Sequence, residues 1–403
     1  MKHIIFVIGN YKNGGVAMRA TNLANQFGAN GYRVTLLSTK EIGKEIFFEQ
    51  KENVELVSLK QFAEAHENEP EIRKDREKQA EQIKRYKRLR RFVRHISSLD
   101  RKLENQIKGL RRSRQLRDYL LLNQGAVLIP FGLACYEMSY YASRGLGCQL
   151  VYAEKNAAEL ECPSDPLERK AMFRILRQAD GAVLQTQNEI DFYKGCLERN
   201  AVVIHNPIKN GLPRPYKGKR RPVVVNFCRI SKQKNLPLLI SAFRRLHEEY
   251  PEYSLEIYGN AVEPLEETQR DELVQSIAEK GETSYIHILP PAADVHQRVR
   301  DCAMFVSSSD FEGLSNSMIE AMAIGMPCVC TDCLGGGARE MITDGENGLL
   351  VPMQDEEALY LAMRRFVLKP ELAEKCGRNA ARITEEMNAK TIGEQWMDLL
   401  ERL

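Results

Sequence analysis

The sequence has no run of about 18 apolar residues, the length that a helix needs to cross a lipid bilayer. Its first apolar run, residues 4–8, is short and is not followed by a small-residue cleavage site, so we interpret it as a buried strand rather than a signal peptide. These absences predict a cytoplasmic protein. A length of 403 residues exceeds what one core usually holds, which favours two domains.

The ten cysteines lack the paired spacing of a zinc site. Cys328, Cys330 and Cys333 lie close together, but the sequence offers no fourth ligand near them. We therefore expect buried free thiols in a reducing compartment, and we expect neither a metal site nor a cofactor.

What the sequence does contain is a twofold alternation of short β-branched runs and amphipathic helical segments. Residues 4–8 and 127–130 belong to the first block, residues 223–227 and 254–258 to the second, and a proline-rich stretch, residues 206–222, separates the blocks. Such alternation predicts parallel sheets that helices cover on both faces. We therefore expect an α/β protein with two Rossmann-like domains facing across a ligand cleft.

The expected domain boundaries follow from the proline-rich stretch. The first domain should span residues 1–207, with a basic helical insertion at about 66–122. The second should span residues 208–387. A last amphipathic helix, at about 388–403, is expected to pack back on the first domain.

Two glutamates eight residues apart, Glu312 and Glu320, mark the most specific segment of the sequence. Gly313 permits a close approach to the backbone, and the free N–H groups at the start of the helix that follows form an anion site. A diphosphate bound there would leave Glu320 within reach of a ribose, and Glu312 beside the group on the outer phosphate.

This segment resembles the glutamate–seven residues–glutamate signature of the retaining family-4 glycosyltransferases, which have the GT-B fold. Further segments resemble other motifs of that family, in the same order over nearly the whole chain. They are Gly14-Gly15 in a first glycine-rich loop, residues 205–207 at the domain junction, residues 227–235 with an arginine and a lysine, and residues 335–348.

The resemblance implies that the first domain binds the acceptor and the second the nucleotide sugar, and it implies roles for these residues. Arg229 and Lys234 would contact the diphosphate, Glu312 the donor-sugar hydroxyls and Glu320 the ribose. Fixed cations would stabilise the leaving diphosphate more in the transition state than in the ground state. The remaining residues expected at the donor are Gly14, Gly15, Gly313, Leu314, Ser315 and Asn316. The family works without a metal, by front-face attack in which the leaving phosphate accepts the proton.

Many members of that family have a histidine near the donor sugar, in the first domain. The corresponding segment here contains Glu154, Lys155 and Asn156, with Lys155 at the place of the histidine. We expect these three residues to contact the donor sugar or the acceptor, and whether Lys155 replaces the histidine stays open.

A strongly basic segment, residues 71–118, holds 18 Lys or Arg against 7 Asp or Glu. Its apolar positions predict one or two amphipathic helices, interrupted near Gly109. The residues expected to contact lipid or a pyrophosphate are Lys84, Arg85, Lys87, Arg88 and Arg91. Anionic lipid, the diphosphate of a polyprenyl-linked acceptor, as in some relatives, and solvent alone are the open alternatives. Nucleic acid is disfavoured because aromatic residues are sparse there.

Together these features predict a retaining hexosyltransferase that moves a hexose or N-acetylhexosamine from a nucleotide diphosphate sugar, UDP-linked by family habit, to a saccharide acceptor. The expected setting is cell-surface polysaccharide synthesis with a lipid-linked acceptor, in the cytoplasm or peripherally on the inner face of the cell membrane. The alternatives are a nucleotide-sugar epimerase-type enzyme on the same fold and a non-catalytic, membrane-associated partner subunit.

Overall fold

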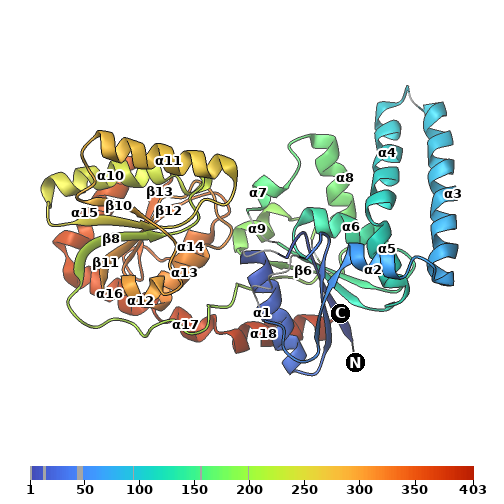
Figure 1. Ribbon diagram of the computed structural model, residues 1–403, viewed down its shortest axis with the longest axis horizontal. Helices are drawn as coiled ribbons and strands as arrows, with labels where there is room; N and C mark the ends of the chain where they lie inside the picture. Colours follow the sequence, from blue (N-terminus) through green and yellow to red (C-terminus); the bar gives the residue numbers. More distant parts are fainter. Residues whose placement is uncertain (1, 12–14, 43–48, 94, 155–156, 198) are drawn as a thin grey trace. The chain divides into compact units, whose positions relative to one another are not determined.

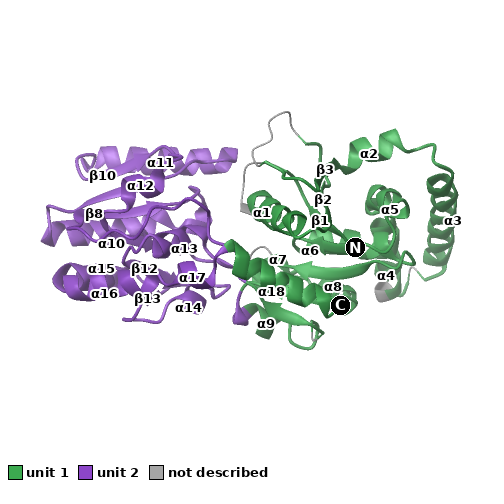
Figure 2. Ribbon diagram, turned by 90° about the horizontal axis from the view of Figure 1, so that it is seen from below, with its two compact units in different colours: residues 1–185, 189–204, 389–403 green, residues 186–188, 205–388 purple. Residues whose placement is uncertain are grey.

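The computed structural model describes residues 2–11, 15–42, 49–93, 95–154, 157–197 and 199–403. The chain divides into two compact units (Figure 2). Unit 1 comprises Met1–Gln185, Glu189–Ile204 and Ala389–Leu403, and unit 2 comprises Thr186–Asn188 and His205–Asn388. The main division lies between Ile204 and His205, three residues before the boundary that the sequence analysis expected between residues 207 and 208.

The described residues of unit 1 form a seven-stranded parallel sheet in the order β3-β2-β1-β4-β5-β6-β7. Its strands are β1 (His3–Ile8), β2 (Arg33–Ser38), β3 (Val54–Ser58), β4 (Val127–Pro130), β5 (Gln149–Ala153), β6 (Gly181–Leu184) and β7 (Ala201–Val203). Because side chains alternate along a strand, Ile5 and Val7 of β1 enter one apolar core, and Ile4 and Phe6 enter the core on the other face.

Helices cover both faces of this sheet. They are α1 (Gly15–Ala29), α2 (Leu59–Ala65), α6 (Leu133–Ser143), α7 (Ala158–Glu161), α8 (Pro166–Leu176), α9 (Gln187–Phe192) and α18 (Ala389–Glu401). The C-terminal helix α18 lies beside α1 and buries Ile392 and Trp396 in the core of unit 1. The last residues of the chain therefore belong to the same unit as the first.

Three further helices form the basic insertion between β3 and β4. They are α3 (Pro70–Val93), α4 (Ser97–Arg112) and α5 (Arg114–Leu121), and α3 and α4 stand side by side (Figure 1). The interruption lies a little later than predicted, because α4 continues through Gly109 to Arg112 and α5 begins at Arg114. The glycine serves packing instead, since a Cβ there would lie 2.3 Å from the ring of Tyr141 in α6.

The base of the insertion is fixed by two ion pairs that connect α3 with α5. Arg76 donates to the buried carboxylate of Asp118 at 2.8 Å, and Arg117 donates to Asp75 at 2.7 and 2.9 Å. Near the junction of α3 and α4, by contrast, the large apolar side chains are exposed, and Phe92 reaches 76%. The insertion is therefore anchored at one end and open to solvent at the other.

Unit 2 has, in its described residues, a six-stranded parallel sheet in the order β10-β9-β8-β11-β12-β13. Its strands are β8 (Arg221–Phe227), β9 (Ser254–Tyr258), β10 (Ile286–Leu289), β11 (Cys302–Ser307), β12 (Cys328–Asp332) and β13 (Leu349–Pro352). In both sheets the strand order reverses next to the first strand of the unit, β1 or β8. Ligands of such sheets bind at the carboxyl ends of the strands near this reversal.

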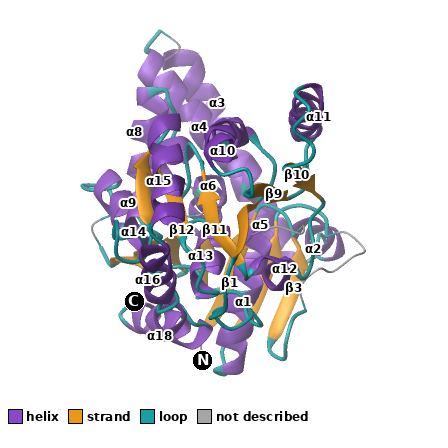
Figure 3. Ribbon diagram, turned by 90° about the vertical axis from the view of Figure 1, so that its left-hand side faces the viewer, coloured by secondary structure: helices purple, strands orange, loops and turns teal. Residues whose placement is uncertain are grey.

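The helices of unit 2 also cover both faces of their sheet (Figure 3). They are α10 (Leu236–Glu249), α11 (Pro264–Glu279), α12 (Val295–Val299), α13 (Asn316–Ala323), α14 (Gly337–Met341), α15 (Glu356–Leu368), α16 (Pro370–Ala380) and α17 (Ile383–Glu386), with a 3-10 turn, η1, at Lys232–Lys234. The predicted α/β class with two Rossmann-like sheets is confirmed.

Among the described residues, none of the helices combines the length and apolar character that crossing a bilayer requires. The ten cysteines are free thiols, and most of them are buried. Within the same residues, no His, Cys, Asp and Glu side chains gather in a group that could hold a metal ion.

Candidate functional site

The loop after β8 carries the predicted arginine and lysine. The chain leaves β8 at Phe227, forms the short turn η1 and enters α10 through Asn235, whose φ of +43° places it in the left-handed region. The hydroxyl of Ser308, just after β11, donates to the carbonyl oxygens of Lys234 and Asn235 at 2.9 and 3.0 Å. These bonds hold the backbone of Lys234 against the end of the neighbouring strand.

The loop after β11 carries Glu312 and is held from two sides. The backbone N–H of Asp310 donates to the carbonyl of Gln233 at 2.9 Å, and that of Glu312 donates to the carbonyl of Leu334 at 2.8 Å. Three loops, which follow β8, β11 and β12, are thus joined at the carboxyl edge of the sheet. Their mutual hydrogen bonds place residues from distant parts of the sequence together.

Lys234 and Glu312 form an ion pair there, with each side chain only 14% exposed. The hydroxyl of Ser309 also donates to the Glu312 carboxylate, at 3.1 Å. Burial lowers the pKa of Lys234, but the adjacent Glu312 carboxylate outweighs it, and the net pKa lies above the usual lysine value. The lysine is therefore a fixed cation whose charge is already compensated.

Gly313, Leu314 and Ser315 lead from this pair into α13. Ser315 is the N-cap residue, and its hydroxyl accepts a long hydrogen bond, 3.5 Å, from the N–H of Met318. Gly337 packs directly on the loop, because a Cβ there would lie 1.7 Å from the carbonyl oxygen of Gly313. The N-terminal end of α13, with its partial positive charge, therefore lies at the end of the loop that carries Glu312.

Glu320, in the second turn of α13, has a partner that the sequence analysis missed. Nε2 of His296, in α12, lies 2.7 Å from the Glu320 carboxylate, and both side chains are largely buried. The ring of His296 packs edge-on against Phe227 at the end of β8. No spacing in the sequence connects His296 with Glu320, so only the fold could reveal this contact.

Arg229 differs from Lys234 in exposure. Its side chain is 50% exposed, and Nε lies 3.3 Å from the carboxylate of Glu266 in the first turn of α11. The guanidinium is still near enough to act on Lys234, since its charge lowers the pKa of that lysine. The structure thus brings Arg229, Lys234 and Glu312 together, since the charges of Arg229 and Glu312 both act on Lys234. Arg229 also has an ion-pair partner of its own, Glu266.

Residues 213–383 match the family model described as Glycosyl transferases group 1. The match lies within unit 2 and covers less than half of the chain. The matched residues include Arg229, Lys234, Glu312 and Glu320, which the sequence analysis assigned to the donor.

Two bacterial glycosyltransferases illustrate the relatives of this chain. An uncharacterized glycosyltransferase of Haemophilus influenzae is 22% identical over 99% of this chain and 100% of its own length. The N-acetylgalactosamine-N,N'-diacetylbacillosaminyl-diphospho-undecaprenol 4-alpha-N-acetylgalactosaminyltransferase of Campylobacter jejuni is 31% identical, but over only 40% of each chain. The chain therefore spans less than half the length of its more similar curated relatives.

Among solved structures, HepE of Anabaena in complex with UDP is similar over the whole of both chains, with a TM-score of 0.75 and 18% identity. The similarity shows a shared fold. The predicted GT-B fold and the resemblance to bacterial glycosyltransferases are confirmed, whereas membership of family 4 in particular stays a prediction.

The ligand contacts predicted for residues of unit 1 stay predictions. Gly14, Lys155 and Asn156 lie outside the described residues, and Gly15 is the first residue of α1. The carboxylate of Glu154 is buried and accepts hydrogen bonds from Tyr152 at 2.5 Å and Tyr193 at 2.9 Å. These bonds hold the carboxylate inside unit 1, and its contact with a sugar stays a prediction.

The five basic residues predicted to meet lipid or pyrophosphate are exposed along α3. They are Lys84, Arg85, Lys87, Arg88 and Arg91. In the part of the chain that the structure describes, none of them forms an ion pair. Their neighbour Arg90 points to α4 instead and binds Asp100 and Glu104 at 2.7 and 2.8 Å. The outer face of α3 is therefore a set of uncompensated cations.

Proposed function

We propose that this protein is a retaining glycosyltransferase that takes a hexose or N-acetylhexosamine from a UDP-sugar and transfers it to a lipid-linked saccharide during cell-surface polysaccharide synthesis. The observation that carries the proposal is the buried Lys234–Glu312 ion pair next to the N-terminal end of α13. A cation, a carboxylate and a helix N-terminus suit a ligand with both a diphosphate and sugar hydroxyls.

In the proposed reaction, an acceptor hydroxyl forms the new bond to the anomeric carbon while the bond to the diphosphate oxygen breaks. The leaving diphosphate takes the acceptor proton, so the protein supplies no nucleophile. Lys234, Arg229 and the N–H groups at the start of α13 meet the growing negative charge, which makes a metal unnecessary. Because Lys234 is held in place by Glu312, little reorganisation is needed when that charge develops.

In this proposal the two glutamates bind different hydroxyl groups of the donor. Glu312, which Ser309 and Lys234 orient, accepts hydrogen bonds from the donor sugar. Glu320 accepts from the ribose, and His296 fixes the orientation of its carboxylate. His296 is thus a positioning residue, and it acts only through Glu320.

Two observations favour a lipid-linked acceptor. The Campylobacter relative is named for an acceptor on diphospho-undecaprenol, and α3 of this chain exposes uncompensated cations beside exposed apolar side chains. Such a surface suits anionic lipid head groups, at about 1 kcal/mol for each basic residue near the membrane. We therefore place the protein in the cytoplasm, peripherally on the inner face of the membrane.

A nucleotide-sugar panel tests the proposal. We expect UDP and one UDP-sugar to raise the melting temperature, because a ligand of the native state stabilises it. Release of UDP from that sugar should depend on an added saccharide acceptor, and the product should keep the anomeric configuration of the donor. Conversion of the donor without acceptor would indicate an epimerase-type enzyme. A lack of any nucleotide effect would indicate a non-catalytic partner and contradict the proposal.

A further inference from the structure

The backbone around Arg229 is held by the loop after β9. The N–H of Cys228 donates to the carbonyl of Tyr258 at 3.0 Å, and the N–H of Ile230 donates to the carbonyl of Asn260 at 2.9 Å. A different pair of loops, after β11 and β12, holds the buried ion pair of the donor site. The two cations of that site therefore have separate supports.

The loop after β9 also packs closely on this backbone. A Cβ at Gly259 would lie 2.0 Å from the carbonyl oxygen of Cys228, so a larger residue would not fit there without a shift. The N–H of Gly259 donates to the carbonyl of Leu289, at the end of β10, at 3.0 Å. Three neighbouring strands, β8, β9 and β10, thus fix the point from which the side chain of Arg229 extends.

Glu266, in the first turn of α11, extends this support to the side chain of Arg229. Its Oε2 atom accepts hydrogen bonds from the backbone N–H groups of Val262 at 2.9 Å and Glu263 at 3.2 Å. The bond with Glu263 belongs to the capping box of α11. The other oxygen, Oε1, lies 3.3 Å from Nε of Arg229. Because the Glu266 side chain is only 11% exposed, its bonds to the backbone set the direction of the carboxylate.

A carboxylate fixed in this way can orient a guanidinium without occupying all of its donors. Arginine has five N–H groups, and Glu266 is the ion-pair partner of Arg229 among the described residues. The Arg229 side chain is half exposed, so further N–H groups can meet a diphosphate. An arginine without such a partner would lose more side-chain entropy on ordering at a ligand.

We propose that Glu266 is a positioning residue for transfer, which holds Arg229 at the leaving diphosphate and acts on the reaction only through that arginine. The inference rests on the proposed function and deepens it. It adds a residue that does not touch the donor to the groups that prepare the site for developing charge. It also accounts for a carboxylate beside an arginine that must meet a second anion, since the carboxylate orients the guanidinium before the donor binds.

A double-mutant cycle on the full chain tests this role, with the UDP-sugar that the nucleotide-sugar panel identifies. Glu266→Gln keeps an acceptor oxygen for the cap but removes the charge that orients Arg229. We expect it to lower kcat about tenfold and to change the KM of the donor less than about twofold, because Arg229 acts mainly on charge that develops as the diphosphate leaves. In the Arg229→Gln background, which keeps a measurable rate because Lys234 remains, Glu266→Gln should have almost no further effect.

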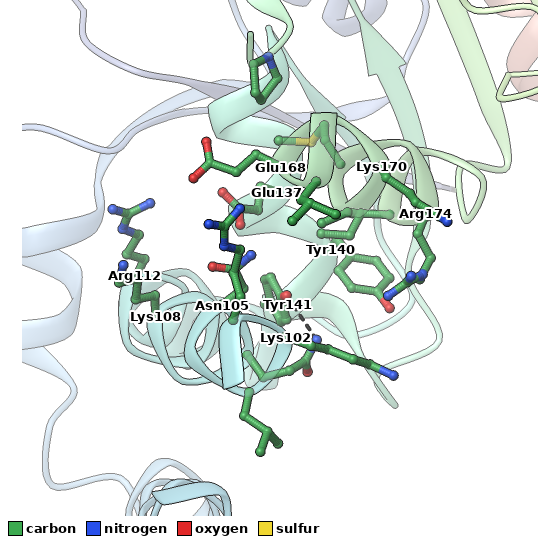
Figure 4. A pocket seen from close by; sticks show the side chains of 18 of the residues that line it. Lys102, Asn105, Lys108, Arg112, Glu137, Tyr140, Tyr141, Glu168, Lys170 and Arg174 are labelled. Atoms are coloured by element: carbon green, nitrogen blue, oxygen red, sulfur yellow. Dashed lines mark hydrogen bonds between the residues drawn. The ribbon is translucent and has the colours of Figure 1, made fainter. Parts of the chain in front are cut away.

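Two matched controls separate orientation from stability, and circular dichroism checks the fold of every variant. Glu263→Gln changes the other carboxylate of the same cap, which forms no ion pair in the described part of the chain, and should leave kcat nearly unchanged. Arg174→Gln removes an arginine from unit 1, where this residue of α8 lines a pocket of about 1000 Å³ (Figure 4). Because Arg174 and Glu266 belong to separate units, Glu266→Gln should still lower kcat about tenfold in that background.

The outcomes separate this inference from the proposed function. An equal fall in kcat on Glu266→Gln with and without Arg229 would show that Glu266 supports only the fold. Unchanged kcat in Glu266→Gln would show that Arg229 needs no such partner, and a loss confined to KM would place Glu266 in donor binding rather than transfer. Each of these results would overturn the inference alone. Absence of transfer from every UDP-sugar by the unchanged protein would contradict the proposed function, and the inference with it.

Discussion

The cations of the two units differ in how their charge is compensated. Lys234 in unit 2 is largely buried and paired with Glu312. In unit 1, by contrast, five basic residues of α3 are exposed and form no ion pair among the described residues: Lys84, Arg85, Lys87, Arg88 and Arg91. A buried charge requires a partner because its desolvation is costly, and an exposed charge does not. The buried pair is suited to catalysis, because Lys234 is held in place before negative charge grows on the leaving diphosphate. The exposed cations are suited to binding an anionic surface, and salt should weaken that binding.

The largest expected effect comes from breaking the buried pair. Lys234→Ala and Glu312→Ala should each reduce transfer by at least about 100-fold, because the leaving diphosphate loses a fixed cation or the sugar loses its orienting carboxylate. Released UDP measures the rate, and circular dichroism checks that the fold persists.

The matched control is Lys232→Ala, which removes an exposed lysine from the same turn. It should leave transfer nearly unchanged. Near-normal turnover in both Lys234→Ala and Glu312→Ala would defeat the site assignment.

The next effect concerns stability at the base of the insertion. Asp118→Ala leaves Arg76 without its buried partner and should lower the free energy of unfolding by about 3 kcal/mol in urea. Glu104→Gln, at the exposed pairs with Arg90 and Lys108, should change it little. Equal effects of the two substitutions would show that burial does not distinguish these ion pairs.

Exposed cations should contribute to membrane binding in a salt-dependent way. The variant Lys84→Gln/Arg85→Gln/Arg88→Gln/Arg91→Gln should bind anionic vesicles at least tenfold more weakly at low salt, with a smaller difference at high salt. Vesicle co-sedimentation measures the partition. If the variant partitions as the unchanged protein does, the outer face of α3 meets only solvent.

A smaller effect is expected where backbone packing supports the donor site. Gly337→Ala places a methyl group against the carbonyl of Gly313, so the loop before α13 must shift. We expect UDP affinity to fall about fivefold, a change of roughly 1 kcal/mol. Unchanged affinity in a calorimetric titration would show that this loop does not contact the nucleotide.

The smallest effect involves a half-buried group, His3, without a compensating charge. Burial, with the nearby Arg33, lowers the pKa of His3 to about 4. The unfolded chain therefore binds more protons between pH 6.5 and 4, and stability should fall as the pH drops through that window. His3→Gln should make the melting temperature less sensitive to pH there, and an unaltered slope would contradict this.

The sequence predicts what local patterns encode. The β-branched runs at residues 4–8 and 223–227 become the strands β1 and β8, and the spacing of Glu312 and Glu320 locates the start of α13. Contacts between distant residues were not predictable, because no periodicity links them. The pairing of His296 with Glu320 is one such contact.

Packing also decided points that the sequence left ambiguous. Glycine usually weakens a helix, so Gly109 suggested a break, but the ring of Tyr141 occupies the space that its missing side chain leaves. Glu154 bonds to Tyr152 and Tyr193, which no pattern in the sequence links to it, and its predicted contact with the donor sugar or the acceptor stays a prediction. In both cases the sequence does not show the tertiary neighbours.

A crystal structure of the full chain with bound UDP tests the central claim most directly. The account predicts the diphosphate within hydrogen-bonding distance of Lys234 Nζ and of the backbone N–H groups at Leu314 to Asn316, with the ribose at Glu320. A diphosphate bound away from Lys234 and from the start of α13 would contradict it.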